Sequence, residues 1–145
     1  MVEMAAARES SGDGEEAAVA MAVDVADPGS LRRARKVVVT MAEDAGLAPS
    51  RADDLLVAVN EVLTNSLRHG GGHGDLLAWT ATGWLVCQVE DAGRLPVPVT
   101  DPKPPPAGAT RGRGLWMVSQ LVDLLQIRSV PAGTSIRVLM RLTPV

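Results

Sequence analysis

The chain has 145 residues, which is enough for one domain with a substantial core. Its aromatic residues are three Trp alone, which argues against a protein that stacks single-stranded bases, and a net charge of −3 gives no reason to expect nucleic acid as a partner. The single cysteine, Cys87, excludes an internal disulfide and a cysteine-rich zinc site. No apolar run is long enough for a membrane span or a signal peptide, so we expect a cytoplasmic protein without a membrane partner.

Residues 1–16 are mainly Ala, Glu, Ser and Gly, and they are predicted to form a disordered acidic tail ahead of a single domain over 17–145. The domain begins with alternating apolar residues up to Val25, which predict a strand. A helix from Leu31 to Asp44 follows, with Ser30 as its expected N-cap. Cations in its first two turns oppose the helix dipole, so they are either solubilising charges or a surface for a partner. They are Arg32, Arg33, Arg35 and Lys36.

A second helix is predicted from Ser50 to about residue 70, where Ser50 and Asp53 could form a capping box. Its apolar residues follow the helical period and make one broad stripe. Glu61 and Asn65 are four residues apart and project from one side of this helix, beside the stripe. Such a pair is common and is either merely solvated or the polar floor of a ligand site.

A glycine-rich loop holds both histidines of the chain, His69 and His73, but no cysteine or further histidine joins them. A metal site built from these two alone is not expected. Two strands joined as a hairpin follow, over 75–80 and 84–91. Asp91 has the parity of the apolar residues in the second strand, so it should point toward the core. A buried carboxylate needs a donor, which either the protein or a ligand must supply.

Residues 94–111 contain six prolines, which exclude a helix and a central strand and predict either a lid or a disordered loop. Gly112 and Gly114 then open a helix whose apolar stripe runs from Leu115 to Leu125. Glycines at a helix N-terminus expose N–H groups to an anion, with Arg111 and Arg113 nearby. Strands over 127–130 and after the turn at 131–133 close the domain, and a threonine, Thr134, faces the core side of the last one.

The order of these elements predicts an α+β two-layer sandwich, in which a mostly antiparallel sheet of about five strands carries three helices on its one apolar face. Polar side chains and helix-opening glycines from four separate segments would then meet between the layers. They are Glu61, Asn65, Asp91, Gly112, Gly114 and Thr134. Together these groups could hold a nucleotide. The carboxylate would accept a hydrogen bond from an amine of the base, the amide would lie beside a hydrated metal ion, and the free N–H groups would bind phosphates.

These segments also resemble known motifs. N-E-V-L-T-N-S-L-R-H-G resembles the N box of the GHKL (Bergerat-fold) ATPases, and V-E-D-A-G resembles their adenine-contacting box. R-G-R-G-L-W-M-V-S-Q-L-V-D resembles their second glycine box, and A-G-T-S-I-R-V-L-M their terminal G-T strand. The resemblance covers about residues 17–142. In its small size and in the residues of these motifs, the chain resembles the anti-sigma-factor serine/threonine kinases of bacteria.

The resemblance implies a role for each matching residue. Asn65 would coordinate Mg²⁺ on the nucleotide phosphates, and Glu61 would be the base that activates the attacking hydroxyl. Asp91 would accept from the adenine amino group, assisted by Thr134, while Gly93 would let the backbone pass close to the base.

The same resemblance places Gly112, Gly114 and Leu115 in the box that binds the nucleotide, with the glycines capping the phosphates. Arg33 matches a position that such proteins use for partner contact. One departure is the absence of the second glycine that usually follows the adenine box, since Arg94-Leu95 stands after Gly93. This departure bears on lid closure and on phosphotransfer more than on adenine binding.

Two functions are implied. The first is an ATP- and Mg²⁺-dependent serine/threonine kinase that phosphorylates an anti-sigma-factor antagonist and sequesters a sigma factor, with a homodimer considered. The second is a non-catalytic protein that keeps a nucleotide and acts by sequestration alone. The ATP-binding half of a sensor histidine kinase is disfavoured, because no helix with a phosphoacceptor histidine precedes the domain.

Overall fold

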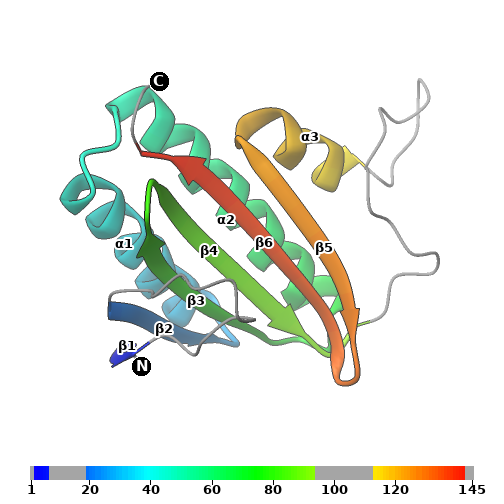
Figure 1. The fold of residues 1–145 in the computed structure, drawn as a ribbon. Helices are drawn as coiled ribbons and strands as arrows, with labels where there is room; N and C mark the ends of the chain where they lie inside the picture. The colour runs from blue at the N-terminus through cyan, green and yellow to red at the C-terminus, as the bar shows by residue number, and fades with distance from the viewer. Residues whose placement is uncertain (1, 7–18, 94–112, 143–145) are drawn as a thin grey trace.

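The computed structural model describes residues 2–6, 19–93 and 113–142, which form a two-layer α+β sandwich (Figure 1). The strands are β1 (Val2–Ala6), β2 (Val19–Val25), β3 (Gly74–Ala81), β4 (Trp84–Asp91), β5 (Leu124–Val130) and β6 (Gly133–Arg141). The helices are α1 (Pro28–Asp44), α2 (Pro49–His69) and α3 (Arg113–Leu121). The described strands form one sheet in the order β1-β2-β3-β4-β6-β5, with every pairing antiparallel. The predicted fold is confirmed, with one strand more than expected.

The additional strand lies in the segment predicted to be a disordered tail. Residues 2–6 pair antiparallel with residues 19–23 of β2, so β1 forms an edge of the sheet. The composition of the tail did not reveal this strand, because pairing at an edge satisfies backbone N–H and C=O groups without requiring an apolar run. The rest of the predicted tail and the predicted lid over 94–111 lie outside the described residues.

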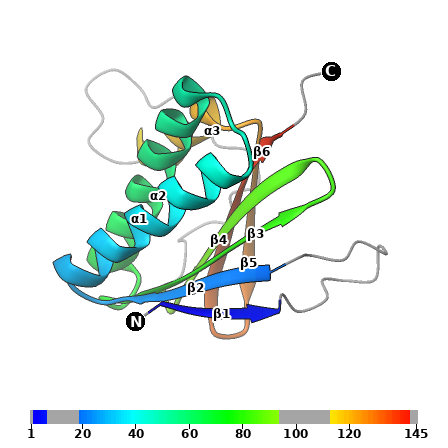
Figure 2. The ribbon, with the colours of Figure 1, turned by 90° about the vertical axis from the view of Figure 1, so that its left-hand side faces the viewer.

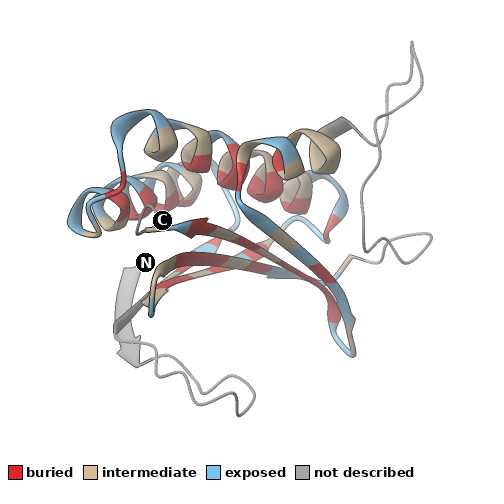
Figure 3. Ribbon diagram, turned by 45° about the horizontal axis from the view of Figure 1, so that its top comes forward, coloured by how far each residue is buried: buried red, intermediate tan, exposed pale blue. Residues whose placement is uncertain are grey.

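The helices cover one face of the sheet, as the side view shows (Figure 2). Buried residues gather between the two layers (Figure 3), where α2 supplies Leu55, Val59 and Leu63 to a core that continues into β3, β4 and β6. This arrangement follows from the helical period of the α2 stripe and the two-residue alternation of the strands. Among the described helices, none has the length and the apolar character that crossing a membrane requires.

The helix ends differ in detail from the predictions. Asp27, rather than Ser30, is the N-cap of α1, and its carboxylate accepts from Ser30 N at 2.7 Å while the Ser30 hydroxyl completes the capping box. The pKa of Asp27 is accordingly lowered, chiefly by the backbone hydrogen bond from Ser30. The capping box predicted at the start of α2 is absent, because Ala48 is the N-cap and makes no side-chain hydrogen bond.

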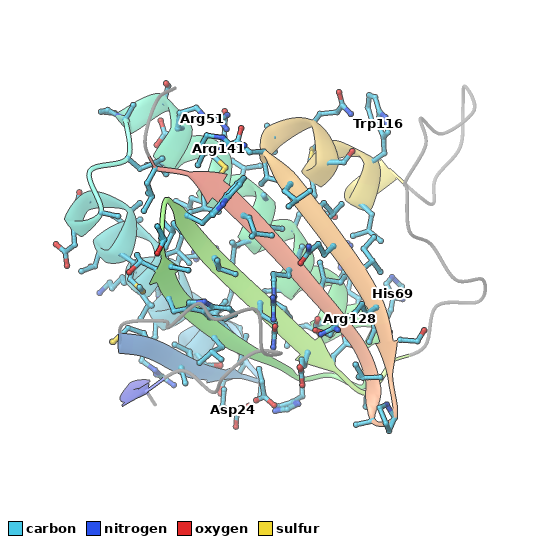
Figure 4. The ribbon with its side chains drawn as sticks, in the orientation of Figure 1. Asp24, Arg51, His69, Trp116, Arg128 and Arg141 are labelled. Carbon is cyan, nitrogen blue, oxygen red and sulfur yellow. The ribbon has the colours of Figure 1, made fainter. Side chains whose placement is uncertain are left out.

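The third helix is shorter than predicted, and Leu125 lies in β5 instead of continuing the helical stripe. The chain leaves α3 where Asp123 N donates to Leu139 O of β6 at 3.1 Å. The Asp123 carboxylate accepts from the Arg51 guanidinium at 2.7 Å and from Arg141 N at 2.7 Å. Burial raises the pKa of Asp123, but these bonds outweigh it and the net pKa is lowered. Figure 4 shows Arg51 and Arg141 close to this junction.

The sheet face opposite the helices also carries a small apolar cluster, which the prediction of one apolar face did not include. Trp79 and Val86 are buried there, with Trp84 and Leu139 packed against them. Two arginines of β6 complete the cluster by cation–π contacts. Arg137 lies 5.1 Å from the centre of the Trp79 ring, and Arg141 lies 4.5 Å from that of Trp84.

Candidate functional site

Asp91, the last residue of β4, is held at the boundary between the sheet and α2. Its Oδ2 accepts a hydrogen bond of 2.6 Å from the hydroxyl of Ser66 on α2, and its Oδ1 accepts one of 2.8 Å from Gly93 N. Each carboxylate oxygen can accept two hydrogen bonds, so each retains capacity for a ligand. Its predicted orientation toward the helices is thus confirmed, and Ser66 and Gly93 are its donors within the protein.

Glycines surround this carboxylate where a side chain would not fit. A Cβ on Gly70 would overlap the Asp91 carboxylate, and one on Gly93 would lie 2.6 Å from His69 O. Gly133 is equally restricted, since its Cβ would lie 2.7 Å from Ala92 Cα. The backbone therefore packs closely on three sides of Asp91 and leaves it fixed in position.

Thr134 lies directly opposite Asp91 in the register of β4 and β6, and it is buried. Its hydroxyl donates to Gly93 O at 2.7 Å. The hydroxyl proton is thus committed to the turn after Asp91, and only the lone pairs of the oxygen remain for a ligand or a water. Thr134 lies in the predicted place, and its visible contact orients the Gly93 backbone.

Glu61 and Asn65 project from α2 toward the first turn of α3. A Cβ on Gly114 would lie 2.5 Å from Glu61 Oε2 and 3.0 Å from Asn65 Nδ2. Both side chains are half-buried and the backbone of α3 rests directly on them. The predicted convergence of the E-x-x-x-N pair with the glycine that opens α3 is therefore present in the structure.

One turn of α2 joins these two groups of residues. Asn65 faces Gly114 on α3, and the next residue, Ser66, holds Asp91 on β4. Ser66 is 2% exposed, so this part of the helix cannot rotate without breaking a buried hydrogen bond. The carboxylate at the sheet and the polar pair beneath α3 therefore have a fixed relative position.

Other predicted residues lie outside this arrangement or outside the described residues. Leu115 is half-buried and packs against the core, and Arg33 is exposed on α1, on a different surface. Gly112 lies outside the described residues. Sequence reasoning did not assign roles to Ser66 and Gly70, although a serine within an apolar helical stripe and a glycine at its end were signals for a buried polar contact and a close approach.

Cys87 has no role at this site. It is buried in the core on β4, and burial raises the pKa of its thiol to about 12. A thiol with so high a pKa carries almost no thiolate at neutral pH, which excludes it as a nucleophile. The polar chemistry of the site therefore rests on carboxylates, an amide, hydroxyls and backbone N–H groups.

The comparison with protein families agrees with this geometry. The model of the histidine kinase-like ATPase domain matches residues 25–140, which include Glu61, Asn65, Asp91, Gly114 and Thr134. No curated protein matches the sequence. The match covers most of the chain and all three helices, and the observed sandwich has the corresponding fold. The chain therefore belongs to the histidine kinase-like ATPase domain family.

Proposed function

We propose that this protein binds Mg-ATP between α2, the start of α3 and the end of β4. The observation that carries the proposal is the close contact of Gly114 with Glu61 and Asn65, where an added Cβ would displace both side chains. A backbone without a side chain at a helix N-terminus lets phosphates approach its N–H groups, and the helix dipole favours their charge. The Asn65 amide oxygen, on the same side, suits a hydrated Mg²⁺.

Asp91 is the proposed contact for the base. Its carboxylate has acceptor capacity left after the hydrogen bonds from Ser66 and Gly93, and an exocyclic amine is a suitable donor. Guanine presents a carbonyl oxygen at the corresponding position, which would face a carboxylate without a proton between them. We therefore expect the site to select adenine over guanine.

Glu61 separates a kinase from a protein that only binds a nucleotide. Bound Mg-ATP would supply the phosphoryl group for transfer. Glu61 would accept the proton of a serine or threonine hydroxyl on a partner protein, which raises the nucleophilicity of that oxygen. Asn65, one turn along α2, would keep the phosphates beside this carboxylate, since such catalysis rests mainly on positioning.

For the partners, we propose an anti-sigma-factor antagonist as the phosphorylated protein and a sigma factor as the sequestered one. The exposed side of α1 and α2 supports a docking surface near Arg33, with Arg32 and Lys36 also exposed. Arg35 donates to Asn60 Oδ1 at 3.0 Å where the two helices meet. Val39 and Val57 are exposed one turn from that contact on each helix, both toward the connecting loop. These two exposed apolar side chains, near the cations of α1, are the feature that supports a protein-binding surface here.

Calorimetric titration with Mg-ATP, Mg-ADP and Mg-GTP tests the nucleotide site. Wild type should bind both adenine nucleotides and bind Mg-GTP at least about tenfold more weakly, since losing a hydrogen bond to a charged group costs about 1.5–3 kcal/mol. Asp91→Asn should weaken Mg-ATP binding to a similar extent. Glu90→Gln is the matched control, because Glu90 precedes Asp91 on β4 but is exposed on the opposite face. Absence of nucleotide binding by wild type would refute the proposal.

Phosphotransfer to a candidate antagonist tests the kinase. Glu61→Gln should bind Mg-ATP but fail to label the partner with radioactive phosphate, whereas Glu43→Gln, at an exposed position of α1, should label it normally. If wild type binds Mg-ATP and sequesters a sigma factor but never transfers phosphate, the function is sequestration without catalysis.

A further inference from the structure

A histidine and two aspartates meet at the ends of β2 and β3, apart from the nucleotide site. His73 Nε2 lies 2.5 Å from Asp24 Oδ1 and 3.2 Å from Asp75 Oδ1. The possible ligand atoms of the three residues all lie within 4.8 Å of one another. Figure 4 shows Asp24 at the edge of the molecule, on β2. From the sequence, a metal site built from the two loop histidines alone was not expected, and no pattern indicated that β2 brings Asp24 to His73.

The sheet register adds an independent observation at this point. Asp24 lies directly opposite Asp75, and Asp75 lies directly opposite Glu90, so three adjacent strands place carboxylates in one row. Like charges at directly opposed positions destabilise a sheet. Among the residues that the structure describes, no lysine or arginine forms an ion pair with these carboxylates. Gln88 Nε2 donates to Glu90 at 3.0 Å, so among the described residues the two carboxylates that face His73 are those of Asp24 and Asp75.

Imidazole cannot neutralise this row alone. The Nε2 atom can carry one proton and donate it well to one oxygen, yet two carboxylate oxygens face it. Without that proton, Nε2 and the two oxygens are three lone-pair donors directed at one another. A cation between them would replace these repulsions by bonds.

We propose that Asp24, His73 and Asp75 bind a divalent transition-metal cation of the Zn²⁺ class. One nitrogen and two carboxylate oxygens suit Zn²⁺, Co²⁺ or Mn²⁺, whereas Mg²⁺ and Ca²⁺ prefer oxygen ligands alone. Ligand atoms in a tetrahedral zinc site are about 3.3 Å apart, given bonds of about 2.0–2.2 Å, and the spacing of 3.2 Å between His73 and Asp75 is close to this value. The 2.5 Å between His73 and Asp24 is a hydrogen-bond distance, so the exposed Asp24 side chain would move outward to make room for the cation. All three side chains are substantially exposed, so water can complete the coordination.

The cation would tie the end of β2 to the start of β3. Glu90 lies opposite Asp75 on β4, and Asp91 follows it on the other face of the strand. The metal would therefore stabilise the end of the sheet that holds Asp91, without itself touching the nucleotide site.

Titration of untagged, nucleotide-free protein with Zn²⁺ tests the site, with Co²⁺ as a spectroscopic probe. Wild type should bind one equivalent of Zn²⁺, and Co²⁺ should give visible absorption bands. A hundredfold excess of Zn²⁺ over its Kd should raise the Tm by about 5 °C or more. His73→Gln and Asp24→Asn should each weaken Zn²⁺ binding by about tenfold or more, since even a partner that only orients a ligand is worth about that much.

His69→Gln is the matched control, because His69 is exposed four residues away at the end of α2 and should not affect Zn²⁺ binding. Metal-free Asp24→Asn should keep a Tm within about 5 °C of that of wild type, because it removes one of two opposed carboxylates together with an exposed contact to His73. Thermal unfolding of the metal-free variant confirms that it is folded. Unchanged Zn²⁺ affinity in His73→Gln, equal loss in His69→Gln or equal affinity for Mg²⁺ would each overturn the proposal. Because these measurements contain no nucleotide, failure here leaves the ATP proposal intact, and failure of ATP binding leaves this one intact.

Discussion

Replacing Gly114 by Ala adds one methyl group at the point where α3 rests on α2. The new Cβ would lie 2.5 Å from Glu61 Oε2 and 3.0 Å from Asn65 Nδ2, both well inside van der Waals contact. These atoms are the ends of flexible side chains, so they can rotate away without unfolding the core. Alanine is also favoured over glycine within a helix by up to about 1 kcal/mol. We therefore expect the free energy of unfolding to change by no more than about 1 kcal/mol.

Nucleotide affinity should respond much more strongly. Rotation of Asn65 away from α3 would remove its proposed contact with the metal and phosphates, and a polar contact to a charged group is worth about 1.5–3 kcal/mol. That range corresponds to a rise of about ten- to hundredfold in the Kd for Mg-ATP. Calorimetric titration gives the Kd, and thermal unfolding followed by circular dichroism gives the stability of the same preparation.

Gly29→Ala is the control for helix propensity. Gly29 lies in the first turn of α1, and its Cβ would meet only Asp27 Oδ1, at an ordinary 3.6 Å. This variant should keep wild-type nucleotide affinity. If Gly114→Ala binds Mg-ATP as tightly as wild type, the contact between α3 and the Glu61–Asn65 pair does not define the phosphate site and the reasoning fails.

Three further expectations follow from single contacts. Ser66→Ala removes the buried donor to Asp91 and should cost about 1.5–3 kcal/mol of stability, measured by urea unfolding. The folded pKa of Asp123 is lowered from 3.8, so its stabilising contribution is present above that value and is lost as the pH falls through the folded pKa. Asp123→Asn should therefore lose stability at neutral pH and show a smaller further loss below pH 3.8, by urea unfolding at several pH values. Cys87, with a thiol pKa of about 12, should react with thiol reagents only after unfolding, which a colorimetric thiol assay checks.

The periodic patterns were sufficient to predict the layers of the fold. Apolar core residues alternate along β4 and β6 and follow the helical period in α2. Because a buried face repeats along its element, these periods show directly which side chains face the core. The ends of elements were less predictable. Leu125 fits the helical period of α3 equally well, but the hydrogen bond from Asp123 N to Leu139 O directs the chain into the sheet. The acceptor of that bond, Leu139, lies on β6, beyond the whole of β5, so no local pattern contains this contact.

The residues of the site divide in the same way, into those that a local sequence pattern indicates and those that only a contact between distant segments reveals. Asp91 was predictable because a carboxylate is unusual at a core-facing position of a strand, whereas Glu61 and Asn65 became candidates only together with the other segments that resemble known motifs. Ser66 was different, since its place in the apolar stripe indicates a buried polar contact but not the partner, which is the Asp91 carboxylate of β4. Asp24 and His73 are separated by the whole of α1 and α2, and only the pairing of β2 with β3 reveals that they meet.

The position of Ser66 suggests why α2 is the element on which binding depends. A nucleotide must contact the sheet with its base and α3 with its phosphates, so the spacing of the two has to be fixed before binding. The buried hydrogen bond from Ser66 to Asp91 fixes the sheet side, while Asn65, the preceding residue, faces α3. A change at Ser66 should therefore affect the affinity for ATP more than that for adenosine, because adenosine lacks the phosphates that make the spacing matter. Comparing the two ligands on Ser66→Ala distinguishes this positioning role from a simple loss of stability, which would weaken both equally.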